Sequence, residues 1–388
     1  MKKNFVIWAI LAALGLAGGW FGQPYLSQKS GNDAKATSKE IKEELSTDAF
    51  SLRLFQHALT EKPAGNILVT PHVISDALLV LQELSAGKTH EELLGLQLKA
   101  GRTLRATEPA SVVLPAMDFN QPRGEKSNLV MALPFSEDIP KSLSLFNGML
   151  ADAMGKPEAQ LADSKMISSR TKLLVGCVTF MNRPWEIPFN SANTRTADFD
   201  NASGGMPHFR QLRSRGLFRT ATAEDGSWRA LAIPFKKDDE TGATLYYIGI
   251  LPASSARDFA IKLSTGQLTG IRKALAEATP EDTLVEIPRL ELQILPFDMR
   301  DSLRRLGLKA LFDSETADFA PLTPEKIHLG AFLHAASVSL IESPDSSKAD
   351  ESLDYAKNII SFTRPYIWLI ADLETPTPID FMGLVEEM

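Results

Sequence analysis

The stretch from Asn66 to Leu78, NILVTPHVISDAL, carries the clearest structural signals in the chain. Its apolar run at residues 67–69 is typical of a strand. Thr70 and Pro71 then predict a helix start, with threonine as N-cap and proline at the first helical position. Apolar residues recur on nearly every turn as far as Leu84, which indicates a largely buried helix.

Helical patterns flank this stretch on both sides. Upstream, apolar residues recur at four-residue steps between residues 50 and 58, which predicts an amphipathic helix. Downstream, Thr89 and Glu92 form a Thr-x-x-Glu capping box that predicts a second helix start. Residues 99 to about 127 show no clean period, so we expect that part to be rich in loops.

Strand patterns dominate the remainder of the chain. They cover residues 173–181, 228–235, 244–251, 283–290, 334–341, 366–373 and 381–385, with a helical pattern at 299–306. A regular helix does not follow each strand, which favours an α+β body with large, mainly antiparallel sheets and helices packed around them. At 388 residues and 44% apolar content, the chain can bury one large core or two smaller ones.

The N-terminus differs in kind from the body. Two lysines precede an apolar run over residues 5–21, which is the layout of an export signal. We expect residues 1–22 to be a signal peptide or signal anchor, because the run is also nearly long enough to span a bilayer. Residues 23–47 are polar and predict a flexible linker. The protein is therefore expected to be periplasmic, extracellular or membrane-anchored through residues 5–21.

Charge and motif content argue against several functions. The 41 basic and 48 acidic residues give a net charge of -7, so nucleic acid is not an expected partner. The six histidines show no metal-binding spacing, and we expect neither a metal nor a cofactor. Cys177 lies in an apolar run and is interpreted as a small buried hydrophobe. His334, at the head of an apolar strand, is interpreted as a hydrogen-bonded structural residue.

One enzymatic hypothesis remains remote. Ser169 and Lys172 match the Ser-x-x-Lys of penicillin-binding enzymes, in which the lysine activates the serine. The companion motifs Ser-Asp-Asn and Lys-Thr-Gly are absent from the sequence. We therefore expect the chain not to be an enzyme, and serine hydrolase chemistry at this pair is the least favoured hypothesis.

Many ordered positions resemble the serpin family. NILVTPHVISDAL is similar to the family's Asn-x-x-x-Ser-Pro-x-Ser-Ile-x-x-Ala-Leu, with Thr70 and Val73 in place of the two serines. The series continues at Gly87–Thr89, Phe180, Trp185, Pro188, Phe189, Thr194, Phe199, Ile233–Phe235, Ile250–Pro252, Ile287–Leu290, Leu303–Leu308, Phe312, Ala317–Phe319, Phe362–Tyr366 and Phe381–Gly383. The resemblance spans about residues 48–388 and implies a serpin domain there, in an exported member of bacterial type.

Two departures from the family pattern stand out. Gly176 and Cys177 replace the Asn-Ala that the family usually places in this strand, which changes the polar contacts near the top of the main sheet. The helix that the family lays across its main sheet has no clear counterpart between residues 140 and 168.

What the resemblance implies is a trap for a serine or cysteine peptidase. An exposed loop is cleaved and then inserts as a central strand of the main sheet, driven by strain in the native fold. The resemblance places this loop at about residues 343–361. Its hinge comprises Glu342, Ser343, Pro344, Asp345, Ser346, Ser347, Lys348 and Ala349. The candidate scissile region comprises Leu353, Asp354, Tyr355, Ala356, Lys357, Asn358 and Ile359.

The composition of the hinge opposes insertion. Alternate residues of a strand face the same side, so one register buries two carboxylates, and the other buries Lys348 and Asp350. An unpaired buried charge is costly, and Pro344 cannot donate a ladder hydrogen bond. The spacing from Glu342 to Phe362 also indicates a loop a few residues shorter than usual.

We therefore expect an exported serpin that presents its loop to a peptidase or another protein without trapping it by insertion. The alternative is a fully functional suicide inhibitor of a serine or cysteine peptidase. The membrane is an expected partner only through an N-terminal anchor.

Overall fold

The computed structural model describes residues 47–98, 110–116, 130–132, 138–154, 162, 165–167, 171–237, 242–343, 350–374 and 378–388. They all belong to one folded unit, Lys42–Met388. The expected export segment and linker up to residue 46, Ser169, and hinge residues 344–349 lie outside the described residues. None of the helices within the described ranges is long and apolar enough to cross a membrane.

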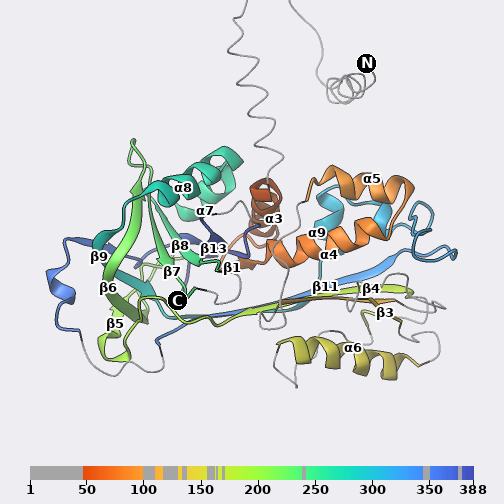
Figure 1. Ribbon diagram of the computed structural model, residues 1–388, viewed down its shortest axis with the longest axis horizontal. Helices are drawn as coiled ribbons and strands as arrows, with labels where there is room; N and C mark the ends of the chain where they lie inside the picture. The colour runs from red at the N-terminus through yellow and green to blue at the C-terminus, as the bar shows by residue number, and fades with distance from the viewer. Residues whose placement is uncertain are drawn as a thin grey trace, which may run out of the picture. The chain divides into compact units, whose positions relative to one another are not determined.

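Two sheets organise the described part of the unit (Figure 1). The main sheet has the order β10 (Leu290–Asp298), β11 (Leu329–Leu340), β4 (Leu173–Met181), β2 (Ala110–Ala116) and β3 (Val130–Ala132). The second sheet has the order β1 (Ile67–Val69), β14 (Phe381–Val385), β13 (Tyr366–Asp372), β8 (Leu245–Pro252), β7 (Trp228–Pro234), β6 (His208–Thr222), β9 (Glu281–Pro288) and β12 (Asn358–Ser361), with β5 (Arg195–Asp198) paired to β6. Most neighbours are antiparallel, which confirms the expected α+β class with mainly antiparallel sheets.

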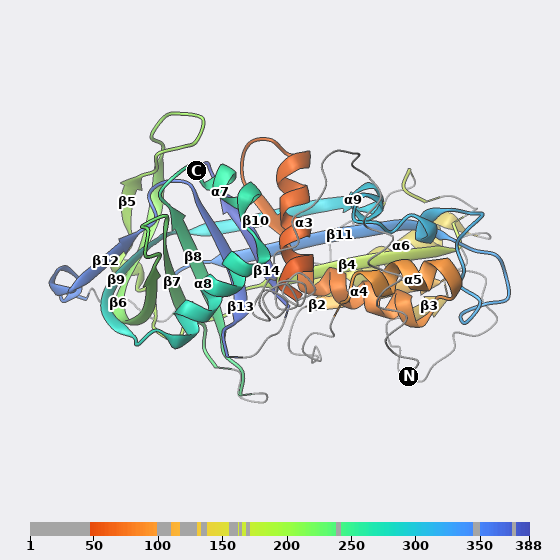
Figure 2. The same cartoon turned by 90° about the horizontal axis from the view of Figure 1, so that it is seen from above.

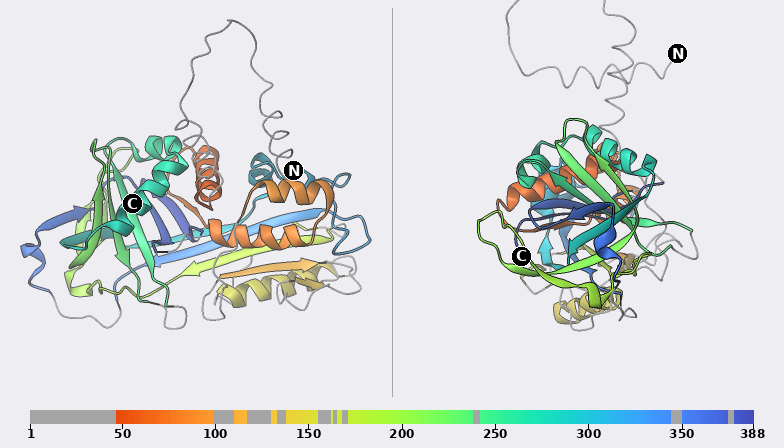
Figure 3. Two further views of the ribbon diagram at one scale, coloured as in Figure 1. Left: turned by 45° about the horizontal axis from the view of Figure 1, so that its top comes forward. Right: turned by 90° about the vertical axis from the view of Figure 1, so that its left-hand side faces the viewer.

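Helices cover the main sheet on both faces (Figures 1 and 2). One face carries α3 (Thr47–Glu61), α4 (Pro71–Glu83), α5 (Gly87–Gly95) and α9 (Arg300–Arg305), and the opposite face carries α6 (Ile139–Met154). The helices α7 (Ala256–Lys262) and α8 (Thr265–Glu277) pack against the second sheet (Figure 3).

The helix α6 corrects one expectation from the sequence. It packs against β2 and β4, although no counterpart of the family's crossing helix was evident between residues 140 and 168. Phe146 of α6 is fully buried, so an apolar face holds the helix in place without the family's usual motif. The stretch at residues 99–127, expected to be loop-rich, contains the strand β2. This strand is stabilised by pairing with β4, a distant partner that the local sequence pattern does not reveal.

The predicted capping box at the start of α5 is also wrong. The helix begins at Gly87, and Thr89 lies inside its first turn, where its hydroxyl accepts a hydrogen bond from the amide of Asp318 at 2.9 Å. The carboxylate of Glu92 accepts one from the amide of Ala310 at 2.7 Å. Both side chains therefore join α5 to the segment after α9 and do not cap their own helix.

Apolar side chains of the described residues form two core clusters. The first joins α3, α4 and α8 to strands of both sheets. The second surrounds Trp185, whose ring stacks on Phe235 with centroids 4.5 Å apart and meets Tyr247 edge-on at 6.2 Å. Gly383 in β14 lies so close to this cluster that a Cβ atom there would be 2.5 Å from the Trp368 ring and 2.7 Å from the carbonyl oxygen of Ile67.

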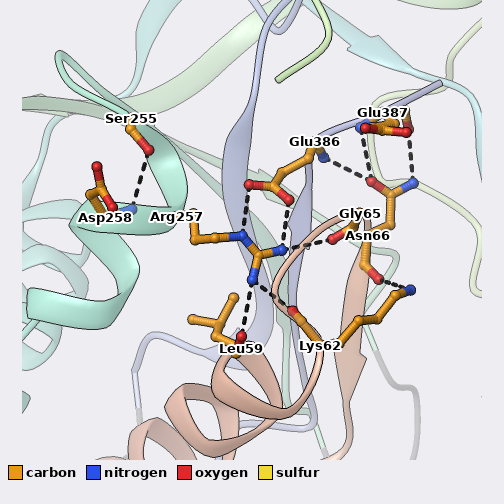
Figure 4. Close-up of polar contacts among 9 residues, drawn as sticks. All are labelled: Leu59, Lys62, Gly65, Asn66, Ser255, Arg257, Asp258, Glu386 and Glu387. Atoms are coloured by element: carbon orange, nitrogen blue, oxygen red, sulfur yellow. Dashed lines mark hydrogen bonds and ion pairs between the residues drawn. The ribbon is translucent and has the colours of Figure 1, made fainter. Parts of the chain in front are cut away.

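A polar cluster joins the last residues of the described chain to the segment at residues 59–66 (Figure 4). The guanidinium of Arg257 donates to both carboxylate oxygens of Glu386, at 2.9 and 2.6 Å. It also donates to the main-chain carbonyls of Leu59, Lys62 and Gly65. The side-chain oxygen of Asn66 accepts hydrogen bonds from the amides of Glu386 and Glu387, at 2.7 and 3.0 Å.

Two histidines meet the start of α4 with opposite protonation. Pro71 is the first helical residue as predicted, but Thr70 does not cap the helix with its side chain, and its hydroxyl instead pairs with Nε2 of His334 in β11. Burial lowers the pKa of His334 to about 3, which agrees with its interpretation as a structural residue. Burial also disfavours charge on His72, but its contacts with Asp380 (2.5 Å) and Asp76 (3.2 Å) prevail and raise its pKa to about 10.

We expect stability to depend on pH in opposite directions around these two residues. The folded pKa of His72 lies above its unfolded value of 6.5, so its stabilisation is complete below pH 6.5 and is lost as the pH rises toward about 10. The folded pKa of His334 lies below 6.5, so the unfolded chain binds a proton first and stability falls between pH 6.5 and about 3.

Urea denaturation between about pH 4 and about pH 9 checks this dependence, with slopes of about 1.4 kcal/mol per pH unit for each proton. In the variant His72→Gln, the free energy of unfolding should no longer decline as the pH rises above neutrality. In His334→Gln, its decline below neutrality should be smaller by the slope that corresponds to one proton. A profile that either substitution leaves unchanged in shape would contradict the assignment of that histidine.

The crowding at Gly383 generates a matched pair of glycine substitutions. Gly383→Ala should lower the free energy of unfolding by about 2 kcal/mol, because its methyl group overlaps a backbone oxygen. Gly270→Ala should raise it by up to about 1 kcal/mol, because Gly270 lies inside α8 with no atom within reach of a new Cβ. Equal effects of the two substitutions in urea denaturation would contradict the packing described for β14.

Candidate functional site

The main sheet is closed at its centre. Strands β11 and β4 pair directly in parallel, in a register that runs from Leu329 opposite Leu173 to Val338 opposite Met181. No other described strand lies between them. The chain that follows β11 therefore leaves the main sheet and reaches β12 in the second sheet, and this connection contains the predicted loop.

The first hinge residue is anchored where β11 ends. Glu342 accepts hydrogen bonds from the hydroxyl of Thr194 at 3.0 Å and from Nε of Arg289 at 3.1 Å. Burial opposes its charge, yet the hydrogen bonds from its own backbone, Thr194 and Arg289 lower the pKa of Glu342. The amide of Ser343 donates to the carbonyl of Phe189 at 2.9 Å. The loop thus departs from a fixed point.

The described chain resumes at Asp350, where the loop is again held by the body. The amide of Asp350 donates to the side-chain oxygen of Asn193 at 2.9 Å. Its carboxylate accepts hydrogen bonds from the amide and the hydroxyl of Ser352, at 2.9 and 2.6 Å. A short 3-10 helix follows at Leu353–Tyr355, and the side chain of Leu353 is buried. This part of the loop is therefore folded against the protein.

Two arginines of β6 hold this segment, and we call Arg213 and Arg215 the arginine latch. Arg215 donates to the carbonyl of Ser352 at 2.6 Å, and it binds both carboxylate oxygens of Asp282 at 2.7 Å. These hydrogen bonds lower the pKa of Asp282. Arg213 contacts the carboxylate of Asp354 at 3.4 Å. Both arginines alternate on one strand, so their side chains share one face of the sheet.

The end of the loop is fixed by strand pairing. β12 runs parallel to β9, with Asn358 opposite Thr283 and Ser361 opposite Glu286. Arg229 donates to the carbonyl of Ile359 at 3.0 Å and to the side-chain oxygen of Asn358 at 2.5 Å. The last two residues of the candidate scissile region are therefore part of a sheet.

The predicted site residues fall into distinct environments. Glu342 and Ser343 are anchored; Pro344, Asp345, Ser346, Ser347, Lys348 and Ala349 lie outside the described residues; Leu353 is buried; Asp354, Tyr355 and Lys357 are exposed; Ala356 is half-buried; Asn358 and Ile359 lie in β12. With 78% of its surface accessible, Tyr355 is the most exposed large apolar side chain of the described part of the chain. Ile359 is also exposed, but it belongs to β12. The accessible part of the candidate scissile region outside a strand is thus the short segment 354–357.

Sequence reasoning missed the residues that hold the loop. Asn193, Arg213, Arg215 and Arg229 gave no motif, although the alternation of arginines at 213 and 215 is visible in the sequence. Their partners in the loop lie more than 125 residues away along the chain, so only the folded arrangement identifies them.

The alternative chemical sites find little support in the geometry. Lys172 is paired with Glu325 at 2.5 Å, and Ser169 lies outside the described residues. Cys177 is fully buried with its sulfur 3.9 Å from the carbonyl of Val73, and burial raises the pKa of its thiol, which disfavours a reactive thiolate. Among the residues that the structure describes, no group of three or more His, Cys, Asp or Glu side chains is arranged to hold a metal ion.

Comparisons with known proteins match this architecture. Serpin B5 of Mus musculus is 20% identical over 87% of this chain and 97% of its own length. Plasminogen activator inhibitor 1 of Mus musculus is 21% identical over 87% of this chain and 90% of its own length. A crystal structure of maspin shares the fold with a TM-score of 0.76 at 18% identity, covering 91% of this chain and 100% of that one. Uncleaved ovalbumin gives a TM-score of 0.75 at 14% identity, covering 89% and 100%.

The family assignment rests on a match to a whole-family model. Residues 127–388 match the model described as Serpin (serine protease inhibitor), and this range is more than half of the chain. The strand order, the closed main sheet and the loop after β11 agree with the resemblance seen in the sequence. The chain belongs to the serpin family, a family of serine protease inhibitors.

Proposed function

We propose that this serpin presents the segment at residues 350–358 to a peptidase or another protein, and that the loop does not insert into the main sheet. The observation that carries the proposal is the arginine latch, which holds the distal half of the loop against β6. Insertion requires these contacts to break. It also requires Leu353 to leave its buried position. The hinge then has to place carboxylates, a lysine and a proline in an inner strand. Each step lowers the driving force for trapping.

The wider setting of the protein is part of the same proposal. We infer export through residues 5–21, a linker to residue 47 and a serpin body at residues 48–388. Serpins bind peptidases as inhibitors, which supports a peptidase as the partner class and a role other than catalysis. Tyr355 and Lys357 are exposed in the accessible segment, so peptidases that cleave after aromatic or basic residues are the first candidates.

Trapping is the alternative function, and one observation favours it. Glu342 is anchored at the end of β11, and β11 pairs directly with β4. A loop that starts at this point is placed to enter between the two strands if they separate. The two functions differ in whether cleavage changes the stability of the body.

Incubation with chymotrypsin and with trypsin separates these functions. We expect cleavage at residues 354–358, no complex that survives boiling in detergent, and no large rise in melting temperature after cleavage. Insertion adds a central strand and therefore raises the melting temperature sharply. A covalent complex, or such a rise, would overturn the non-inserting proposal.

A hinge variant tests the reason for the absence of insertion. Replacement of residues 344–351 by glycine, threonine and alanine removes the charges and the proline. If the hinge alone prevents insertion, cleavage of this variant should raise its melting temperature. No thermal gain would mean that β4 and β11 themselves do not separate, and the explanation based on the hinge would be wrong.

The arginine latch should protect the loop from cleavage. The double variant Arg213→Ala/Arg215→Ala should be cleaved about tenfold faster within residues 352–358, because release of the segment raises the population of open loop. Lys273→Ala is the control, since it removes an exposed charge that pairs with Glu277 on α8. Initial rates measured by mass spectrometry at low peptidase concentration check the result. Equal rates for the two variants would contradict a holding role for the latch.

A further inference from the structure

A cavity of about 560 Å³ lies between α3, β1, β10 and α9. Its volume falls within the range of small-molecule sites, roughly 300 to 1,000 Å³. It shares no lining residue with the loop or with the arginine latch. It is therefore a separate feature that the inhibitory function of the family does not require.

The walls of the cavity are apolar over much of their area. Leu54 from α3, Val69 from β1 and Met299, next to α9, line it, and each of these residues is almost fully buried. Leu292 of β10 lines it as well. Walls of this kind stabilise the apolar body of a ligand by removing it from water.

The carboxylates that line the cavity are already paired. Each of its carboxylates contacts an arginine: Glu61 with Arg305, Asp298 with Arg300 and Asp301 with Arg304. The ammonium group of Lys62 donates to the carbonyl of Asn66 at 2.9 Å (Figure 4). The carbonyl is neutral, so Lys62 keeps its positive charge, but its side chain is exposed and water screens that charge. An anionic ligand therefore gains little from it, and the carboxylates that line the cavity already have cationic partners. This pattern favours an uncharged ligand.

His57 provides a buried polar atom that lacks a hydrogen-bond partner. It lines the cavity, and its Nε2 atom is buried without a hydrogen-bond partner among the described residues. Burial, and then the positive charge of Arg305, lowers the pKa of His57. The ring is therefore neutral, and Nε2 donates or accepts according to its tautomer. A buried polar atom without a partner is unfavourable, and a ligand can supply that partner.

We propose that this cavity binds an uncharged, mainly apolar small molecule that carries one hydroxyl or carbonyl group, with His57 as its hydrogen-bond partner. The apolar walls determine the affinity, and the histidine determines the orientation. The site is specific to the arrangement of α3 and α9 around β10, and it is independent of loop cleavage.

Calorimetric titration with three probes tests the chemistry of the site. 2-Naphthol should bind at one site and raise the melting temperature by mass action. Naphthalene, which lacks the hydroxyl group, should bind about tenfold more weakly. 2-Naphthoate should bind no more tightly than naphthalene, because the ammonium group of Lys62 is exposed and its charge is screened by water. Absence of 2-naphthol binding, or tighter binding of the anion, would overturn the proposal.

Variants locate the binding in the cavity. Ala58→Phe fills the cavity and should abolish 2-naphthol binding. If this variant does not fold, Ser302→Phe, which fills the cavity from α9, should give the same result. His57→Leu should bind 2-naphthol and naphthalene equally, whereas His208→Leu, at an exposed histidine, should keep the tenfold difference. Unchanged binding to a folded, filled variant would place the probe elsewhere and refute the site.

Discussion

The direct pairing of β4 with β11 is the constraint on which the structure depends. These strands lie about 150 residues apart along the chain and meet in parallel in the middle of the main sheet. Parallel strands need cover on both faces, and α4 and α6 provide it. The contact of Thr70 with His334 then joins the start of α4 to β11. While this pairing persists, the segment after β11 has no place between these two strands, and its described residues 350–357 lie outside the main sheet, at the surface of the body.

The surface position does not leave that segment free. Its two ends are held by different means, a half-buried glutamate at the start and a parallel strand at the end. Between them, the latch and the side chain of Leu353 fold the chain back onto the body. The charges that argue against an inner strand are thus satisfied outside the sheet: Asp350 and Asp354 both find donors there. The charged residues that disfavour insertion into the main sheet therefore stabilise the loop outside it.

Much of the fold was predictable because apolar strands carry their own signal. The run at residues 173–181 coincides with β4, and the patterns at 366–373 and 381–385 match β13 and β14 within one residue. β6 escaped prediction because four arginines interrupt its apolar alternation. α6 escaped because its family motif is missing, although its apolar face is present. Thr70 is the N-cap residue of α4 as predicted, but its hydroxyl group makes no capping bond because it pairs with His334. The capping box predicted at Thr89 is wrong, and that hydroxyl group accepts from Asp318 instead.

The candidate site was likewise predictable only in part. Glu342 could be recognised from a short motif, but the contact of Arg213 with Asp354 spans 141 residues, and local patterns contain no information on such distances. His57 and its cavity were likewise invisible, because a cavity is defined by what four separate elements leave empty. Sequence reasoning thus predicted a loop between β11 and β12 and could not determine how it is held.

The position of β14 constrains how the protein is made. The strand lies between β1 and β13 in the second sheet, and the amides of Glu386 and Glu387 bond to Asn66 near the start of the body. Among the described strands, β1 therefore has no neighbour in its sheet until Phe381–Val385 have been synthesised. Folding from the N-terminus during translation therefore cannot complete the second sheet before β14 has been made. The two edges of this sheet that β14 joins stay apart while the intervening strands are synthesised.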